Sequence, residues 1–283
     1  MPNPEQRLTH AFSVDVEEWY HPLRFFQKTD GYGPSRLWLG LERLLALLDE
    51  HGTKGTFFWI ADVAVACPEA LRLVAEQGHE IACHSYSHEH MIYHQTPAEF
   101  KADTERAMKT LQDIAGVEVR GFRAPCFSIT ARSLWAFDIL GELGFDFDSS
   151  VFPVHNWRYG IPGFRETPNM VGDTHPLLEI PLSVRKVAGV NIPAGGGAYF
   201  RIYPYWLTAA NFRHLEAKGQ PAVFYIHTWE LDPEHPRVRF DWRAMITHYV
   251  NLSRTEGRLR RLLSEFRFAP LGELVSRGVA DAH

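Results

Sequence analysis

Two histidines four positions apart in the stretch HSYSH, His84 and His88, have the spacing of a metal-binding pair. Neutral imidazoles at this spacing can bind one divalent ion from a helical turn or a tight loop, although the pattern alone is a weak signal. A catalytic zinc site takes three protein ligands from His, Asp and Glu and keeps one position open. The two histidines therefore need a carboxylate from another part of the chain.

Two carboxylates, Asp15 and Glu17, lie two positions apart in the stretch SVDVEEW. On a strand, residues two apart point to the same face. Carboxylates that face inward together are costly unless they hold a cation, share a proton or meet a base. The pair either joins the histidines in one site or lies on a solvated edge, and the motif alone leaves both interpretations open.

Further polar residues stand at the ends of apolar runs: Arg123 in GFRAPCF, Asp148 in FDFDSS and His227 in YIHTWELD. An arginine can hold a carboxylate such as Asp15 through two parallel hydrogen bonds. A lone histidine in an apolar run is more often a core residue, so His227 is functional only if its strand ends beside the others. Cys126 follows the arginine motif, and inert packing is the favoured interpretation of this thiol.

Aromatic residues gather in two stretches rich in Pro and Gly, 151–164 and 193–206. The candidates for stacking on sugar rings are Trp157, Tyr159, Tyr199 and Tyr203. Three consecutive glycines at 195–197 can let the chain approach a ligand closely. Ordinary core packing is the alternative for each aromatic residue.

Short apolar runs that alternate with stretches of helical spacing must position these residues. We predict strands at 10–16, 54–60, 79–84, 119–124, 145–150, 177–183 and 222–229. We predict helices at 36–52, 68–78, 96–116, 130–144, 204–219 and 254–268, the third with Thr96 as N-cap and Glu99 at N3. This alternation indicates an α/β fold with parallel strands, either a barrel or an open sheet, whose carboxyl strand ends share one face.

The bulk composition limits the classes of function. The 283 residues are 45% hydrophobic and 22% charged, which is ordinary for a globular protein, and we predict one domain over 1–283 with a helical extension from about 240. The net charge of −5 shows no excess of basic residues of the kind that nucleic-acid-binding proteins have. The three cysteines form no C-x-x-C pair, and the sequence shows neither a signal peptide nor a long apolar run. These features predict a cytoplasmic protein without a membrane span. The oligomeric state stays unknown.

The order Asp15, His84-x-x-x-His88, Arg123-x-Pro, Asp148 and His227 resembles the polysaccharide deacetylase family, the NodB-homology or carbohydrate esterase family 4 enzymes. The stretches SVDVEEW, FDSSVFP and YIHTWELDP are similar to the subgroup linked to bacterial exopolysaccharide export loci. The resemblance covers roughly residues 10–235. It implies a TIM-like, distorted (β/α) barrel with about seven strands.

The resemblance also implies the reaction, which is metal-dependent removal of an N-acetyl or O-acetyl group from a bacterial polysaccharide or oligosaccharide, with the N-acetyl group as the expected one. Position by position, Asp15 matches the catalytic base and Arg123 the residue that orients it. His227 matches the general acid, with Asp148 as the candidate partner that keeps it protonated. The implied partner is an acetylated glycan.

The metal ligands implied by the resemblance are His84, His88 and a carboxylate. The common family motif has two adjacent Asp residues and uses the second as a ligand, whereas this chain has Val16 there. Some relatives use Asp-x-Asp instead, and Glu17 fills that second place, so Glu17 is the predicted third ligand. The expected ion is Zn²⁺, with Co²⁺ or Ni²⁺ as alternatives.

Two other functions stay open. An allantoinase-like member of the same superfamily would cleave a small cyclic amide and can work without metal. A catalytically inactive carbohydrate-binding protein would keep the fold, although a binding protein has no need for both a base and an acid. Metal analysis together with acetate release separates all three.

Overall fold

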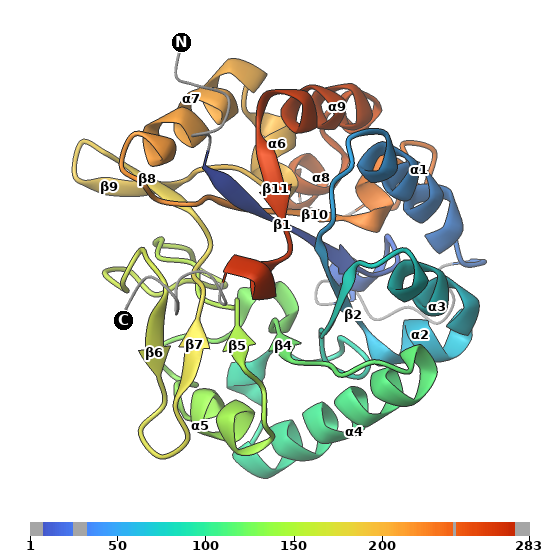
Figure 1. Cartoon of the computed structure of the whole chain (residues 1–283), viewed down its shortest axis with the longest axis vertical. Coiled ribbons are helices and arrows are strands. Elements are labelled where there is room, and N and C mark those ends of the chain that lie inside the picture. The colour runs from blue at the N-terminus through green and yellow to red at the C-terminus, as the bar shows by residue number, and fades with distance from the viewer. Residues whose placement is uncertain (1–7, 25–32, 240–241, 275–283) are drawn as a thin grey trace.

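A curved sheet with helices on its outer side forms the framework of the molecule in the computed structural model, which describes residues 8–24, 33–239 and 242–274 (Figure 1). In spatial order its strands are β10 (Val223–His227), β1 (Thr9–Val16), β2 (Thr56–Trp59), β3 (Glu80–Cys83), β4 (Gly121–Phe122), β5 (Phe147–Asp148), β7 (Leu177–Glu179) and β6 (Asn169–Val171). Neighbouring strands are parallel except β6 and β7. The seven predicted strands are present, and the predicted distorted (β/α) barrel is confirmed in the form of a half-barrel.

Helices follow most strands, as the alternation predicts. Their bounds are α1 (Leu37–Glu50), α2 (Ala61–Ala66), α3 (Pro68–Glu76), α4 (Pro97–Ala115), α5 (Trp135–Glu142), α6 (Gly197–Ile202), α7 (Tyr205–Glu216), α8 (Trp242–Tyr249) and α9 (Thr255–Glu265). The capping box of α4 is confirmed, since Thr96 Oγ1 accepts from the Glu99 amide and Glu99 accepts from the Thr96 amide. None of the described helices combines the length and the apolar composition needed to cross a bilayer.

Some elements differ from the sequence prediction. The six-residue helices α2 and α6 are too short to show helical periodicity, and the hairpin of β8 (Val184–Val187) and β9 (Val190–Pro193) lies outside the predicted strands. The predicted helix at 254–268 ends earlier, because 267–269 form β11 (Arg267–Ala269), which pairs with the first residues of β1. The predicted C-terminal helical extension begins at about residue 240. Residues 240–241 of this extension lie outside the described residues.

Strand β1 separates two layers of the core by alternation. Phe12, Val14 and Val16 belong to the large cluster that packs against the helices. Ala11 belongs to a second cluster inside the half-barrel, together with Phe58 of β2 and Ala82 of β3. Because successive side chains on a strand point to opposite faces, Asp15 lies on the inner face and Val16 on the outer face. This alternation decides which polar residues reach the interior.

The chain after β11 covers the amino ends of two strands. The Leu271 amide donates to Thr56 Oγ1 at 2.7 Å, and the Gly272 amide donates to Glu80 Oε2 at 3.1 Å. Thr56 and Glu80 are the first residues of β2 and β3. A site inside the half-barrel is therefore reached from the carboxyl ends of the strands.

Gly196 and Gly197, two of the three consecutive glycines, pack against the ring of Tyr225, which also lines the cavity described below. Gly196 has φ +101°, and a Cβ atom added there would lie 2.4 Å from Tyr225 Cδ1. A Cβ atom added at Gly197 would lie 2.6 Å from Tyr225 Cε2. The glycines thus let the start of α6 lie on this ring.

Replacing Gly196 with alanine is expected to lower the free energy of unfolding by about 2–5 kcal/mol, because the substitution combines backbone strain with overpacking. Urea unfolding followed by circular dichroism measures this loss. Gly257→Ala in α9 is the matched control: it meets open space, and we expect equal or slightly higher stability. Equal stability of Gly196→Ala and the native protein would contradict the packing described here.

Candidate active site

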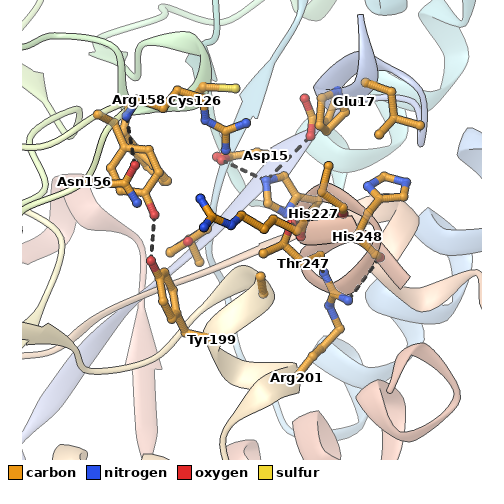
Figure 2. Close-up of a pocket in the computed structure, with 18 of the residues that line it drawn as sticks. Asp15, Glu17, Cys126, Asn156, Arg158, Tyr199, Arg201, His227, Thr247 and His248 are labelled. Carbon is orange, nitrogen blue, oxygen red and sulfur yellow. Dashed lines mark hydrogen bonds and ion pairs between the residues drawn. The ribbon is translucent and has the colours of Figure 1, made fainter. Parts of the chain in front are cut away.

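A cavity of about 650 Å³ opens at the carboxyl ends of the parallel strands (Figure 2). Five of the residues singled out from the sequence line it together: Asp15, Glu17, His84, His88 and His227. They follow or end β1, β3 and β10, as expected for a parallel fold. All five are largely buried, so the tertiary structure gathers charge and imidazole groups away from bulk water.

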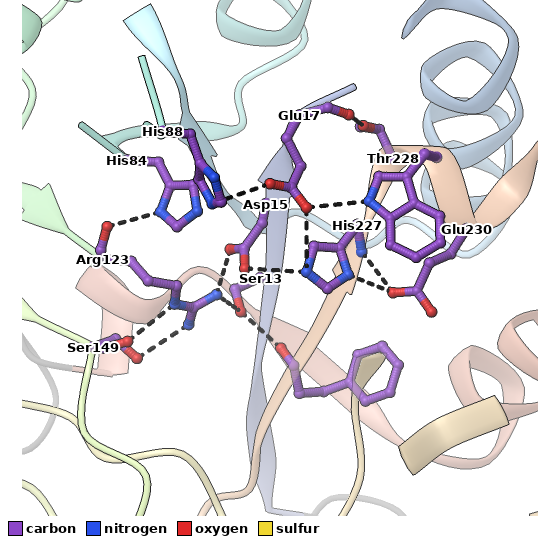
Figure 3. A network of polar contacts seen from close by, with 12 residues as sticks. Ser13, Asp15, Glu17, His84, His88, Arg123, Ser149, His227, Thr228 and Glu230 are labelled. Atoms are coloured by element: carbon purple, nitrogen blue, oxygen red, sulfur yellow. Dashed lines mark hydrogen bonds and ion pairs between the residues drawn. The ribbon is translucent and has the colours of Figure 1, made fainter. Parts of the chain in front are cut away.

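The carboxylate of Asp15 is held by an arginine, as predicted (Figure 3). Arg123 Nη1 donates to Asp15 Oδ1 at 2.8 Å and to Ser13 Oγ at 2.9 Å, and the remaining guanidinium nitrogens donate to Ser149. Burial would raise the pKa of Asp15, but the charges of Arg123 and of two neighbouring histidines lower it below its ordinary value. Asp15 is therefore an oriented anion.

The three predicted metal ligands lie close together. One ligand atom each of Glu17, His84 and His88 falls within 4.8 Å of the others, and Glu17 Oε2 lies 3.3 Å from His88 Nε2. With zinc–ligand bonds of about 2.0–2.2 Å, two ligands of a tetrahedral ion lie about 3.3–3.6 Å apart. Glu17 Oε2 is buried without a hydrogen-bond partner, a costly state that a cation would relieve. The donor set fits a divalent ion.

The loop after β3 brings the second histidine back to the first. Ser85 and His88 have φ +68° and +55°, and Ser85 Oγ accepts from the His88 amide at 3.2 Å. His84 Nδ1 donates to the Arg123 carbonyl at 2.7 Å, which leaves its Nε2 for a metal. Burial lowers the pKa of His84 to about 4, so the imidazole is neutral and able to bind a cation.

Val16 occupies the position of the usual family ligand and faces away from this site. Its side chain packs in the outer core, whereas Asp15 and Glu17 line the cavity. The two-residue spacing of these acids therefore delivers both carboxylates to the interior.

The imidazole of His227 lies at the end of β10, beside Asp15 in strand register. Its Nε2 is 3.8 Å from Asp15 Oδ2 and 3.6 Å from Glu17 Oε1. Its Nδ1 is 2.6 Å from Glu230 Oε1. Burial would lower the pKa of His227, but the hydrogen bond to Glu230 and the nearby carboxylates raise it to about 9. His227 is thus charged at neutral pH, with Nε2 toward the other site groups.

Two residues that the sequence analysis missed support this imidazole. Glu230 is ion-paired with Arg201, and Arg201 also donates to the carbonyls of Thr247, His248 and Val250 around the end of α8. Burial would raise the pKa of Glu230, but Arg201 and the imidazole lower it to about 2. The spacing His-x-x-Glu in HTWE was an available signal for Glu230, whereas no local pattern marks Arg201.

The prediction that Asp148 is the partner of His227 is wrong. Asp148 is in register with Phe122 on one side and Glu179 on the other, and Phe122 packs in the outer core. Register partners on parallel strands point to the same face, so Asp148 faces the helices and adjoins Glu179. Glu230 takes the place that Asp148 was expected to fill.

Three of the four predicted aromatic residues line the cavity: Trp157, Tyr159 and Tyr199. The hydroxyl groups of Tyr159 and Tyr199 are hydrogen-bonded at 2.8 Å. The prediction for Tyr203 is wrong, because this ring does not line the cavity and lies beside Tyr199 with centroids 5.9 Å apart. Tyr203 is the residue after α6, where the chain turns toward α7.

The thiol of Cys126 lines the cavity but is not activated. Burial raises the pKa of Cys126 to about 12, so the thiol stays protonated at neutral pH. Nucleophilic catalysis needs the thiolate. The interpretation of Cys126 as an inert packing residue fits this environment.

Two family models match consecutive parts of the chain. Residues 32–146 match the model described as polysaccharide deacetylase, and residues 149–276 match a domain of unknown function, DUF3473. The first range contains both candidate histidine ligands, His84 and His88, and Arg123. The second contains His227, Glu230 and Arg201, so the candidate site draws on both ranges and on Asp15 and Glu17 before them.

Curated relatives match somewhat less than half of the chain. The "Putative polysaccharide deacetylase YheN" of Bacillus subtilis is 27% identical over 45% of this chain and 44% of its own length. A peptidoglycan-N-acetylglucosamine deacetylase of Bacillus cereus is 26% identical over 47% of each chain. The chain thus aligns with about half the length of these relatives. A crystal structure titled "putative polysaccharide deacetylase from Mycobacterium smegmatis" shares the fold, with a TM-score of 0.66 at 21% identity over 100% of this chain and 94% of that one.

Proposed function

We propose that the chain is a member of the polysaccharide deacetylase family and a metal-dependent hydrolase that removes N-acetyl groups from a polysaccharide or oligosaccharide. The observation that carries this proposal is the convergence of Glu17, His84 and His88 beside Asp15 and His227 in one cavity. The similarity to the peptidoglycan-N-acetylglucosamine deacetylase of Bacillus cereus supports nitrogen as the leaving atom. Membership of the exopolysaccharide-locus subgroup stays a prediction.

Glu17, His84 and His88 would hold a divalent ion, with Zn²⁺ as the expected one. When bound, such an ion supplies Lewis-acid chemistry: it lowers the pKa of water and polarises a carbonyl.

The chain's own residues carry the proton transfers. Asp15, held ionised by Arg123, takes a proton from the water that attacks the acetyl carbonyl. His227, held charged by Glu230, gives a proton to the leaving amine as the carbon–nitrogen bond breaks. The products are acetate and the free amino sugar. The rings of Tyr159 and Tyr199 bind the acetylated sugar beside these groups, and the exposed ring of Trp157 extends the sugar-binding surface outward.

Acetate release tests the proposed function. The purified protein, loaded with Zn²⁺, Co²⁺ or Ni²⁺ in turn, is incubated with N-acetylglucosamine oligosaccharides, and acetate and free amine are quantified. We expect stoichiometric release of both, and loss of release after chelation or in Asp15→Asn. Hydrolysis of allantoin without acetate release would favour the cyclic-amide alternative, and glycan binding without any turnover would favour an inactive carbohydrate-binding protein.

The pH dependence of turnover is expected to report His227. Turnover should fall at alkaline pH as His227 loses its proton, because the leaving amine then lacks a donor. Glu230 raises the pKa of His227, so Glu230→Gln should move this alkaline limb to lower pH. A cation bound at Glu17 would offset part of the effect of this carboxylate on the pKa of His227. The quantity to compare is therefore the difference in the position of the alkaline limb between the native protein and Glu230→Gln.

Full profiles of kcat against pH for the native protein and Glu230→Gln measure this shift. Glu105→Gln on the exposed side of α4 is a control that removes an equal charge far from the cavity. An alkaline limb at the same pH in all three proteins would contradict the role given to Glu230.

A further inference from the structure

Two Trp–Arg dipeptides from distant parts of the chain line the cavity. Trp157 and Arg158 lie in the loop after β5, and Trp242 and Arg243 begin α8. In Figure 2, Arg158 and Asn156 lie on one side of the cavity, and Thr247 and His248 of α8 lie on the other.

The two tryptophans are exposed although they line a cavity. Trp157 is 78% and Trp242 is 64% exposed, which places both rings at the mouth rather than in the core. Large apolar groups that stay exposed beside a cavity mark a binding surface. An indole ring offers a flat apolar face together with one polar N–H group, which suits the mixed apolar and hydroxyl surface of a sugar.

A guanidinium group lies close to each of these rings. Arg158 Cζ is 5.8 Å from the centroid of Trp157, and Arg243 Cζ is 5.3 Å from the centroid of Trp242. A sugar bound at either indole ring therefore lies near a guanidinium group. Guanidinium groups pair with carboxylates through charge-assisted, often bidentate, hydrogen bonds.

The acidic residues of the cavity lie deeper. Among its described lining residues the carboxylates are Asp15 and Glu17, which are 2% and 1% exposed. The third lining arginine, Arg201, is buried and ion-paired with Glu230. The lining therefore has positive charge at the mouth and negative charge at the floor, in a protein of net charge −5.

From this arrangement we infer that the cavity takes an anionic glycan, in which the acetylated sugar at the floor is flanked by sugars that carry carboxylates, that is, uronic acids. The inference rests on the proposed function for the sugar at the floor. The Trp–Arg pairs then bind the flanking residues, with the indole rings on the sugar faces and the guanidinium groups on the carboxylates.

Turnover of two oligosaccharides of equal length tests this specificity: one alternates N-acetylglucosamine with glucuronic acid, and the other contains N-acetylglucosamine alone. We expect kcat/KM to favour the acidic substrate by about tenfold or more, mainly through KM, and the preference to shrink between about 50 and about 500 mM salt. The double variant Arg158→Gln/Arg243→Gln should lose most of this preference. Arg260→Gln, an exposed arginine paired with Glu50, is the control that should keep it.

Binding measured without turnover separates this inference from the proposed function. Titration calorimetry of Asp15→Asn with both oligosaccharides is expected to give at least about tenfold tighter binding of the acidic one at low salt. Tighter binding of the acidic chain supports the inference even if no acetate is released, in which case only the proposed reaction fails. Equal binding of both chains, or an unchanged preference in Arg158→Gln/Arg243→Gln, overturns it.

Discussion

Replacing His84 with alanine is expected to remove the bound divalent ion and to lower deacetylase turnover by about 10³-fold or more. The expected size follows because a metal ion contributes several kcal/mol to such a reaction, and 1.36 kcal/mol corresponds to a factor of ten. In the proposed metal site His84 would supply one of three ligand atoms through Nε2, since its Nδ1 donates to the Arg123 carbonyl. Metal content by elemental analysis and acetate release, measured on the same preparation, test the expectation.

His90→Ala is the matched control, because this histidine lies in the same loop but is exposed and outside the metal cluster. Glu17→Gln tests the carboxylate ligand with little change in size, and it should lose metal as His84→Ala does. One equivalent of metal and native turnover in His84→Ala would exclude the proposed site. Equal losses in His90→Ala would instead indicate damage to the loop.

Replacing His227 with alanine is expected to lower turnover of N-acetyl substrates by about 10²–10⁴-fold, the usual contribution of a general acid. Amines leave poorly without a proton, whereas an aryl alcohol leaves readily. An aryl acetate should therefore lose far less rate in His227→Ala than an N-acetyl sugar does. Steady-state kinetics on both substrates, with metal content as a check on the site, measure the difference.

The partner of His227 can be tested in the same series. If Glu230 acts by holding this imidazole, the losses in His227→Ala and Glu230→Gln are not additive in the double variant. Asp148→Asn provides the contrast, because Asp148 faces the helices, and kcat should stay within about threefold of the native value. Additive losses would contradict the role given to Glu230, and a large loss in Asp148→Asn would contradict the conclusion that Asp148 lies outside the site.

Much of the site was predictable from local patterns. The spacing of two places Asp15 and Glu17 on one face of β1, and the spacing of four in HSYSH lets the loop return His88 to His84. Parallel topology follows from the alternation of strands and helices, and it brings the carboxyl ends of β1, β3 and β10 to one cavity. These features depend on short stretches and on chain order.

Other parts of the site depend on contacts between distant segments. Glu230 was missed because its role depends on an ion pair with the buried Arg201 of α6. No local sequence pattern marks Arg201. The wall formed by α8 was missed for the same reason, since Trp242 and Arg243 meet the loop of Trp157 only through the tertiary structure. Tyr203 was misplaced because an aromatic residue near a site can equally pack behind another ring.

The sequence by itself determined the parallel α/β architecture, the residue types at the strand ends, and the pair of carboxylates and the pair of histidines that can share an ion. The tertiary structure alone decided the direction of each side chain at those ends. Asp148 shows why: side chains alternate along a strand, so a difference of one residue in register moves a carboxylate from the cavity to the helices. On a strand as short as β5 no pattern fixes that register, and only pairing with its neighbours does.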